Sequence, residues 1–401
     1  MALEIARGIY WVGANDTEIS LFESLWPVPE GVSYNSYLVV GEEGVALIDP
    51  VRSRFASEML EKVGSVVDPR DLDYVVLNHA EPDHSSGLPP LLSSSPKAVV
   101  VGTTFASRLL DALYRLEREF RVVKSGDRLD LGGKSLEFTA TPWLHWPETM
   151  MTYVPEEKVL FSGDAFGAYG ALGADALFDN QLDEEELARE SKEYFATIVS
   201  GFSKSVLGAV EKLKDLEVRI LAPSHGPVYR SRPSWIVELW SKWSKPVLEE
   251  KVVVVYASMY GNTEKLARAV ARGVEKAGLE APIHDLSESE INEVLADVID
   301  APGIAIGSPT YELNPFPAVA YFVELVGLKK IAGRVVGLFG SFGWSGGAVA
   351  KLKKRLTELK MQVLERAVEV RGSPTDEDLG RAEELGRELA KKAEEIATSS
   401  S

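Results

Sequence analysis

The residues best suited to chemistry are histidines and acids that share four short segments of the chain. Four of the five histidines lie in these segments, which read NHAEPDHSS, TPWLHWPET, FSGDA and APSHGP. Imidazoles and carboxylates in this number suit two borderline divalent ions better than one closed, four-coordinate structural zinc. A carboxylate can bridge such a pair, and many acids beside few imidazoles favour iron or manganese over zinc. The candidate metal ligands are His79, Glu81, Asp83, His84, His145, Asp164 and His225.

These ligands need strands to position them, and residues 1–245 alternate short apolar runs with amphipathic ones. Three of the four segments follow an apolar run by a few residues, and His145 follows one at slightly longer range. Because side chains that follow strands meet at one edge of a sheet, we expect them to converge. The expected strands are Tyr34–Val40, Gly44–Asp49, Asp73–Leu77, Ala98–Val101, Ser135–Ala140, Lys158–Ser162 and Val218–Ala222. The expected helices are Arg52–Val63, Phe105–Leu116, Glu184–Leu213 and Trp235–Trp243.

A plainer interpretation is that these residues are unrelated polar groups in turns. That explanation would suit one isolated histidine, but four histidines placed with acids near strand ends make it improbable. The fifth histidine, His284, lies in the run PIHDLS without a comparable pattern of acids. We therefore expect His284 to be a structural or surface residue.

Apolar and amphipathic segments alternate more regularly in the second half of the chain. Residues Pro246–Glu250 resemble a short linker. Beyond them strands alternate with single helices, which is typical of a parallel, doubly wound sheet. We therefore expect two domains, 1–248 and 249–401. The expected strands read KVVVVYAS, APIHDLS, GIAIGSPT and RVVGLFGS and include Glu365–Val370. The expected helices are Thr263–Ala277, Glu288–Val298, Pro317–Val326, Gly347–Leu359 and Asp376–Ile396.

The turn after the first of these strands has the composition of a phosphate cradle. It opens a helix, so hydroxyls and backbone N–H groups would gather at a helix N-terminus. No Lys or Arg lies between Tyr256 and Glu264, so neutral donors would hold the phosphate. The absence of GK[ST] excludes a nucleoside-triphosphate loop, and the absence of GxGxxG disfavours a dinucleotide site. The candidate residues are Ser258, Met259, Tyr260, Gly261, Asn262 and Thr263.

Two further loops, Ser308–Pro317 and Gly340–Ala348, follow strands on the same expected sheet edge. Tyr311 and Trp344 could sandwich a flat ring there, and small neighbours would let backbone groups reach its polar edge. The three loops together resemble the phosphate loop and the two ring-binding loops of flavodoxins, which implies FMN. The ring-loop candidates are Pro309, Thr310, Tyr311, Glu312, Asn314, Ser341, Phe342, Gly343, Trp344, Gly346 and Gly347.

The histidine and acid segments of the first half resemble the metallo-β-lactamase superfamily, and more closely its flavodiiron branch. Hydrolases of the superfamily usually have a histidine where this chain has Glu81, and a carboxylate there favours iron. The resemblance covers nearly the whole chain. It implies an α/β protein, with an N-terminal metallo-β-lactamase-like αββα sandwich followed by a flavodoxin-like doubly wound parallel sheet.

The same resemblance implies how the ligands are shared. His79, Glu81 and His145 would hold one iron, Asp83, His84 and His225 the other, and Asp164 would bridge the two. Trp146 and Tyr194 would line the substrate pocket, although core packing is a competing interpretation for both. One local departure lies in the middle flavin loop, where relatives often have Asn and Gly and this chain has Glu312, Leu313 and Asn314.

The activity that the resemblance implies is reduction of O2 to water, of NO to N2O, or both. Reduced FMN carries two electrons and a diferrous site two more, which matches four electrons for O2 and two for a pair of NO molecules. Relatives form a head-to-tail homodimer, and we expect the same arrangement or a dimer of dimers. The chain ends at Ser401 without a cysteine, so we expect a separate donor, either rubredoxin or a reduced deazaflavin.

Composition excludes several other classes. A net charge of −18 opposes binding to nucleic acid. The lack of cysteine excludes disulfides, iron–sulfur clusters and thiolate zinc sites. No apolar run approaches the roughly 20 residues of a membrane span, and no secretion signal opens the chain, so we expect a cytoplasmic protein without membrane contact.

The sequence is compatible with three alternative functions. The chain could be a metal-dependent hydrolase with an accessory flavodoxin-like domain, but Glu81 and the three flavin loops argue against this, and a yellow colour on purification would count strongly against it. It could be an RNA-processing nuclease of the same superfamily, although its charge argues against that. It could also be an electron carrier with a structural metal site, which rapid metal-dependent turnover of a diatomic gas would exclude.

Overall fold

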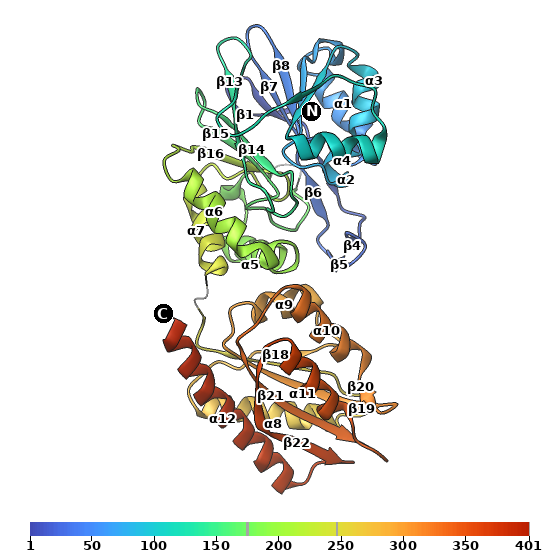
Figure 1. The fold of residues 1–401 in the computed structure, drawn as a ribbon, viewed down its shortest axis with the longest axis vertical. Helices are drawn as coiled ribbons and strands as arrows, with labels where there is room; N and C mark the ends of the chain where they lie inside the picture. The colour runs from blue at the N-terminus through green and yellow to red at the C-terminus, as the bar shows by residue number, and fades with distance from the viewer. Residues whose placement is uncertain (174–175, 246–247, 401) are drawn as a thin grey trace. The chain divides into compact units, whose positions relative to one another are not determined.

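The computed structural model describes residues 1–173, 176–245 and 248–400. The chain divides into two compact units, Met1–Ser244 and Lys245–Ser401 (Figure 1). The first two residues of the expected linker, 246 and 247, lie outside the described residues. No helix in the described part of the chain is both long enough and apolar enough to cross a membrane.

The first unit contains two sheets. The seven-stranded sheet has the order β1-β2-β7-β8-β9-β10-β11, and the five-stranded sheet has the order β12-β13-β14-β15-β16. The strands of the larger sheet are β1 (Leu3–Ala6), β2 (Ile9–Trp11), β7 (Tyr37–Val40), β8 (Val45–Ile48), β9 (Tyr74–Val76), β10 (Val99–Gly102) and β11 (Phe120–Val122). Those of the smaller sheet are β12 (Arg128–Asp130), β13 (Ser135–Ala140), β14 (Met150–Val154), β15 (Val159–Gly163) and β16 (Ile220–Pro223).

The core of this unit lies between the two sheets. Val39, Ile48 and Val76 of the larger sheet share one buried cluster with Phe138 and Phe161 of the smaller sheet. Apolar residues at alternate strand positions place these side chains on the inner faces. Figure 1 shows helices on the outer side of each sheet, which completes the expected αββα sandwich. They are α1 (Ala56–Gly64), α3 (Leu88–Ser94) and α4 (Thr104–Tyr114) on the larger sheet, and α6 (Ser203–Leu213) and α7 (Pro233–Ser244) on the smaller.

The expectation of one continuous helix over Glu184–Leu213 is wrong. The segment contains α5 (Glu184–Tyr194), a π-helical turn (Phe195–Val199), a short 3₁₀ turn (Ser200–Phe202) and α6. Hydroxyls compete with the backbone here, because Thr197 Oγ1 donates to Glu193 O at 2.7 Å and Ser200 Oγ donates to Ala196 O at 2.7 Å. Such π turns frequently accompany functional sites, and this one directly follows Tyr194.

The second unit has a five-stranded parallel sheet with the order β18-β17-β19-β21-β22, as expected for a flavodoxin-like fold. Its strands are β17 (Val252–Tyr256), β18 (Ile283–Asp285), β19 (Gly303–Tyr311), β21 (Val335–Phe342) and β22 (Gln362–Arg371), and the short β20 (Asn314–Pro315) pairs antiparallel with β19. The helices are α8 (Asn262–Lys276), α9 (Ile291–Val298), α10 (Pro317–Leu328), α11 (Ala348–Glu358) and α12 (Asp376–Ser400).

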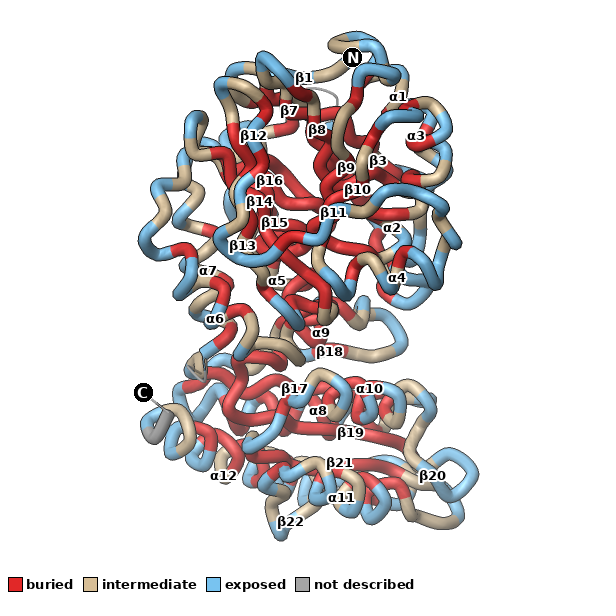
Figure 2. The backbone as a smooth tube through the Cα atoms, turned by 45° about the horizontal axis from the view of Figure 1, so that its top comes forward, coloured by how far each residue is buried: buried red, intermediate tan, exposed pale blue. Residues whose placement is uncertain are grey.

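The helices of this unit enclose the sheet, whose central strands are buried (Figure 2). Helices α8 and α12 lie against each other at very short range because glycines face the neighbouring backbone. A Cβ atom at Gly386 would lie 2.1 Å from Val270 O, and one at Gly273 would lie 2.0 Å from Glu383 O. This packing fixes α8, whose N-terminus follows the expected phosphate turn.

Candidate metal centre and cofactor pocket

All seven candidate ligands of the first unit lie at or just beyond the ends of strands or in the short helix α2 (Pro82–Ser85). His79 and Glu81 occupy the loop after β9, and Asp83 and His84 lie in α2. The loop between β13 and β14 carries His145, while Asp164 directly follows β15 and His225 follows β16. The two sheets therefore contribute to one centre, and both supply rigid frames for it.

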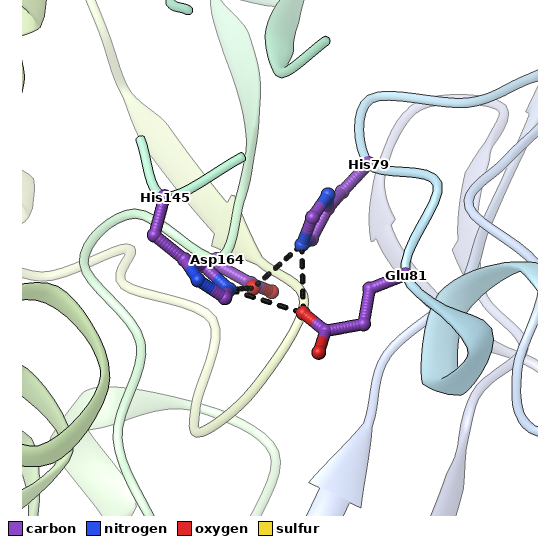
Figure 3. A group of neighbouring side chains, drawn as sticks. All are labelled: His79, Glu81, His145 and Asp164. Carbon is purple, nitrogen blue, oxygen red and sulfur yellow. Dashed lines mark hydrogen bonds and ion pairs between the residues drawn. The ribbon is translucent and has the colours of Figure 1, made fainter. Parts of the chain in front are cut away.

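The first group of ligand atoms gathers around Glu81 and one oxygen of Asp164 (Figure 3). Glu81 Oε2 lies 3.0 Å from His79 Nε2 and 3.1 Å from His145 Nε2. Asp164 Oδ2 lies 3.4 Å from His79 Nε2 and 3.2 Å from His145 Nε2. The four residues offer one ligand atom each, all within 4.8 Å of one another.

The second group gathers around Asp83 and the other oxygen of Asp164. Asp83 Oδ2 lies 3.4 Å from His84 Nε2 and 3.3 Å from His225 Nε2. Asp164 Oδ1 lies 2.8 Å from His84 Nε2 and 3.7 Å from His225 Nε2. The two oxygens of Asp164 thus face different groups of ligands, which is the arrangement a carboxylate needs to bridge two ions.

The charges of this cluster depend on one another. Burial lowers the pKa of His84, but Asp83 and Asp164 outweigh burial and raise it to about 9. Burial also lowers the pKa of His145, and the adjacent carboxylates of Asp164 and Glu81 raise it to about 9. Burial alone would raise the pKa of Asp164, yet the neighbouring imidazoles, His84 and His79 foremost, hold it well below its ordinary value. Imidazolium charge and carboxylate charge are therefore balanced within the cluster.

The same atoms fit a pair of metal ions. Among the described residues, Nε2 of His84, His145 and His225 and Oδ1 of Asp83 and Asp164 are buried without an aligned hydrogen-bond partner. Orphaned buried polar atoms are costly unless something binds them. Cations would satisfy these atoms and take over the role of the imidazolium protons.

Glu148 is a buried carboxylate that the sequence analysis did not single out. Its Oε1 accepts hydrogen bonds from His79 Nδ1 at 2.8 Å and from the backbone N–H of Ala80 at 3.0 Å. The signal was available, because Glu148 lies three residues after His145 in the segment TPWLHWPET. Its hydrogen bond fixes the imidazole tautomer, so that His79 Nε2 carries the free lone pair.

A backbone carbonyl orients His225 in the same way, and a second buried carboxylate, Asp49, holds the backbone of His79. His225 Nδ1 donates to Ser33 O at 2.6 Å, which also leaves its Nε2 toward the centre. Asp49 Oδ1 accepts from the backbone N–H of Asn78 at 2.7 Å and of His79 at 3.3 Å. Burial raises the pKa of Asp49 to about 6. Neither Ser33 nor Asp49 carries a sequence signal that separates it from an ordinary strand-end residue.

Tyr194 and Trp146 lie beside the ligands. The ring centre of fully buried Tyr194 lies 5.6 Å from that of His225, and its hydroxyl is buried without a hydrogen-bond partner in the described chain. Burial, followed by the negative charge of Asp164, raises the pKa of Tyr194 well above its ordinary value. The Trp146 ring is 5.3 Å from His79 and only partly buried. The fifth histidine, His284, lies in the second unit, where its Nε2 is 2.8 Å from Asp297 Oδ2.

The second unit has a cavity of about 360 Å³ at the C-terminal ends of β17, β19 and β21. Residues from all three candidate loops line it, and Gly372 joins them without having been expected. Trp344 is 76% exposed and Tyr311 43% exposed, so both rings are free to cover a flat ligand. The lining residues are Ser258, Met259, Tyr260, Asn262, Pro309, Thr310, Tyr311, Glu312, Ser341, Phe342, Gly343, Trp344 and Gly372.

The other candidates are not among the residues that line this cavity. Gly261 precedes α8 in a left-handed conformation with φ of 78°, and Thr263 Oγ1 is 2.9 Å from Ser341 Oγ. Asn314 donates from Nδ2 to Glu312 O at 2.8 Å. Gly346 and Gly347 precede α11 next to Glu369, with Gly347 N 3.5 Å from Glu369 Oε1.

The middle loop is a tight hairpin between β19 and β20. Tyr311 pairs with Asn314 across a turn made by Glu312 and Leu313, whose φ angles are 48° and 63°. Two left-handed residues in succession usually demand Asn-Gly or a similar pair. The turn in this chain therefore carries two side chains, Glu312 and Leu313, that do not favour its conformation.

Comparisons with known proteins agree with this geometry. Residues 32–226 match the family described as ODP family beta lactamase, and residues 254–395 match the flavodoxin family. The nitric oxide reductase of Moorella thermoacetica is 37% identical over 393 residues, which cover 96% of this chain and 97% of that protein. The anaerobic nitric oxide reductase flavorubredoxin of Escherichia coli O1:K1 is 35% identical over 399 residues, covering 98% of this chain and 82% of that protein.

Two solved structures are similar over their whole length. The flavodiiron protein from Giardia intestinalis has a TM-score of 0.96 and 31% identity, covering all of this chain and 98% of that chain. The rubredoxin oxygen:oxidoreductase from Desulfovibrio gigas has a TM-score of 0.94 and 29% identity, with 99% of each chain covered.

Proposed function

Because the chain belongs to the flavodiiron family, we propose that it is an oxidoreductase that reduces O2 to water, NO to N2O, or both. The observation that carries the proposal is Asp164, whose two carboxylate oxygens face two separate groups of ligands. The family comparisons favour this function over the hydrolase alternative. The carboxylate of Glu81 in the first ligand group and the cavity in the second unit also favour this function.

The cofactors are two iron ions in residues 1–248 and FMN in residues 249–401. In this proposal His79, Glu81 and His145 would hold one iron, Asp83, His84 and His225 would hold the other, and Asp164 would be shared between them. When bound, the iron pair supplies attachment and reduction of the gas, and FMN supplies two electrons. The protein orients the ligands through Glu148 and Ser33.

Tyr194 and Trp146 complete the substrate pocket in this proposal. The free hydroxyl of Tyr194 donates a hydrogen bond to the oxygen atom on which negative charge develops. That hydroxyl stays protonated because its pKa lies well above the ordinary value. Trp146 covers the first ligand group with an apolar ring and excludes water from the reacting gas.

Neutral groups would hold the flavin. The turn Ser258–Thr263, where α8 begins after Gly261, would bind its phosphate, and the helix N-terminus would stabilise the negative charge. Tyr311 and Trp344 would stack on the ring system, and backbone groups of residues 309–314 and 341–347 would bind its polar edge.

The proposed electron donor is a separate molecule, either a protein or a reduced deazaflavin. Two of the similar proteins carry rubredoxin in their names, so rubredoxin is the first donor to test and a reduced deazaflavin the second. We further propose a head-to-tail homodimer or a dimer of dimers in the cytoplasm. Light scattering measures the assembly. Mixing a chain impaired in iron binding with one impaired in FMN binding should restore turnover only if subunits share a reaction.

The first experiment is rapid mixing of the anaerobically photoreduced protein with O2 and, separately, with NO. Flavin absorbance reports reoxidation. Fast reoxidation by one gas assigns that gas as substrate, and fast reoxidation by both assigns a bifunctional enzyme. A metal-depleted sample that reoxidises equally fast with each gas would show that the flavin alone reacts, and the proposed function would fail.

A further inference from the structure

Glu23 lies in a small hairpin that packs on the ligand cluster. The hairpin is formed by β4 (Leu21–Phe22) and β5 (Trp26–Pro27), close to β6 (Val32–Tyr34) in Figure 1. Phe22, the residue before Glu23, lies edge-on against a ligand, with 5.2 Å between the ring centres of Phe22 and His225. Glu23 itself has φ of 51°, a left-handed conformation that turns its side chain out of the strand direction.

The carboxylate of Glu23 is held in place by a buried indole. Its Oε2 accepts a hydrogen bond from Trp26 Nε1 at 3.2 Å, and Trp26 is 2% exposed. Glu23 remains exposed to solvent as a residue. The hairpin therefore gives Glu23 a fixed anchor on the protein side and an open path to water.

The charged groups that act most strongly on Glu23 belong to the metal centre. They are Glu81 in the loop after β9, His145 in the loop between β13 and β14, and Asp83 in α2. The negative charge of Glu23 also contributes to the raised pKa of Tyr169, of which burial is the largest cause. Within the described chain, Glu23 forms no ion pair with any of them, so its carboxyl group is neither a ligand in either group nor locked by a cation.

Glu23 is also suited to exchange protons near neutral pH. Partial withdrawal of its carboxyl group from water, followed by the charge of Glu81, raises the pKa of Glu23 to about 7. His145 and the Trp26 hydrogen bond oppose this rise. Burial is the largest cause of the rise, and the charges of Glu81 and Asp83 contribute less. A proton carrier is most effective when its pKa lies near the working pH.

We propose that Glu23 is the residue that carries protons from solvent to the gas reduced at the metal centre. The inference rests on the proposed function, whose reactions consume protons: O2 with four electrons and four protons gives two waters, and two NO with two electrons and two protons give N2O and water. In each transfer the carboxyl O–H bond of Glu23 breaks and an O–H bond forms on the reacting oxygen. Bulk water then returns a proton to Glu23, and the electrons come from reduced FMN and the iron pair.

The other acids near the centre are less suited to this task. Glu81, Asp83 and Asp164 belong to the ligand groups, and Glu148 is engaged with His79. The competing explanation is that Glu23 only closes the hairpin by accepting from Trp26. Glu23→Gln separates the two roles, because an amide oxygen can still accept that hydrogen bond while the amide cannot release a proton at neutral pH.

The test uses the full chain loaded with iron and FMN, with Glu30→Gln as the matched control. Glu30 is an exposed acid close to the same hairpin in the chain and belongs to neither ligand group. Glu23→Gln should slow flavin reoxidation by the substrate gas about 100-fold or more, with iron and FMN content unchanged. In Glu23→Ala, added formate or imidazole should restore the rate in proportion to its concentration, because a small acid can replace a missing proton carrier.

A second readout does not involve turnover. In the metal-depleted chain, the fluorescence of Trp26, isolated by subtracting a Trp26→Phe variant, should titrate near neutral pH and lose this transition in Glu23→Gln. Equal rates in Glu23→Gln and Glu30→Gln would overturn the proposed role of Glu23 and leave the proposed function standing. A slow variant that small acids do not rescue would assign Glu23 to hairpin structure and also overturn it. A wild-type chain that reduces neither gas would overturn the proposed function and this role together.

Discussion

Glu148 Oε1 accepts a hydrogen bond from His79 Nδ1 at 2.8 Å, and the two side chains are almost completely buried. Because the carboxylate takes up the Nδ1 proton, His79 can offer only Nε2 to a metal ion. The same hydrogen bond orients the ring toward Glu81 and Asp164. A residue outside the ligand groups thus decides how a ligand binds.

Glu148→Gln should lower iron affinity about 10- to 100-fold, since the amide keeps the shape of Glu148 but loses the charge that supports the His79 ligand. Iron titration of the metal-depleted chain measures the effect. Glu156→Gln is the control, because Glu156 bonds to Ser135 at the far end of β13. Equal iron affinity in the two variants would mean that Glu148 is only a packing residue.

Tyr194→Phe should leave iron and FMN content intact and slow gas reduction about 10- to 100-fold. This decrease in rate corresponds to the loss of one hydrogen bond to a charged group, which is worth about 1.5–3 kcal/mol. Tyr229→Phe is a close control, because the hydroxyl of Tyr229 is also buried without a hydrogen-bond partner in the described chain. A rate for Tyr194→Phe as high as that of the control would leave Tyr194 as core packing.

The stability of the metal-depleted chain should fall as the pH rises from about 6.5 through about 9. The folded-state pKa values of His84 and His145 are raised to about 9 from the ordinary 6.5, so the folded chain binds more protons than the unfolded chain in this window. Their stabilisation is complete below the lower value and is lost above the upper one. Thermal unfolding across this range measures the fall.

Iron should remove that dependence, because metal-bound imidazoles are already deprotonated. The iron-loaded chain should instead release metal as the pH falls, when protons compete for the same nitrogens. Chelator-coupled absorbance follows this release. A metal-depleted chain that becomes more stable between these pH values would contradict the charge balance described for the cluster.

Trp344→Ala should weaken FMN binding about 10-fold, because an exposed ring that covers the flavin contributes stacking beyond its buried area. Quenching of flavin fluorescence on titration into the FMN-depleted chain measures the affinity. Trp235→Ala, in α7 of the first unit, is the control. If both variants bind FMN as tightly as the wild type, Trp344 lies outside the flavin contact.

Replacing Glu312 and Leu313 with Asn and Gly should stabilise the FMN-depleted second unit by about 1 kcal/mol. Both residues adopt left-handed conformations, which cost side chains about 1–2 kcal/mol each, while the flexibility of Gly in the unfolded chain offsets part of the gain. Calorimetry should show a rise of about 2–4 °C in the unfolding temperature of that unit. A lower temperature would mean that these side chains stabilise the hairpin through contacts.

Much of the fold could be predicted because the signals are local. Apolar strands and amphipathic helices alternate in the second half, so the doubly wound sheet and its loops at strand ends follow from the periodicity of β17, β19 and β21. The interruption of the helix after Tyr194 could not be predicted, because hydroxyl bonds such as Thr197 to Glu193 compete with helical bonds of nearly equal strength.

The sequence by itself determined which metal ligands and which cofactor loops this protein has. Residue types decide what a side chain can bind, and the positions of these residues after strands follow from local periodicity and not from tertiary contacts. Only the tertiary structure decided how the centre is divided, with one oxygen of Asp164 toward His145 and the other toward His84. It also brought Glu148 to His79 and Glu23 to the vicinity of Glu81. These pairings join segments far apart in the chain, and through-space distance across two packed sheets has no local signature in the sequence.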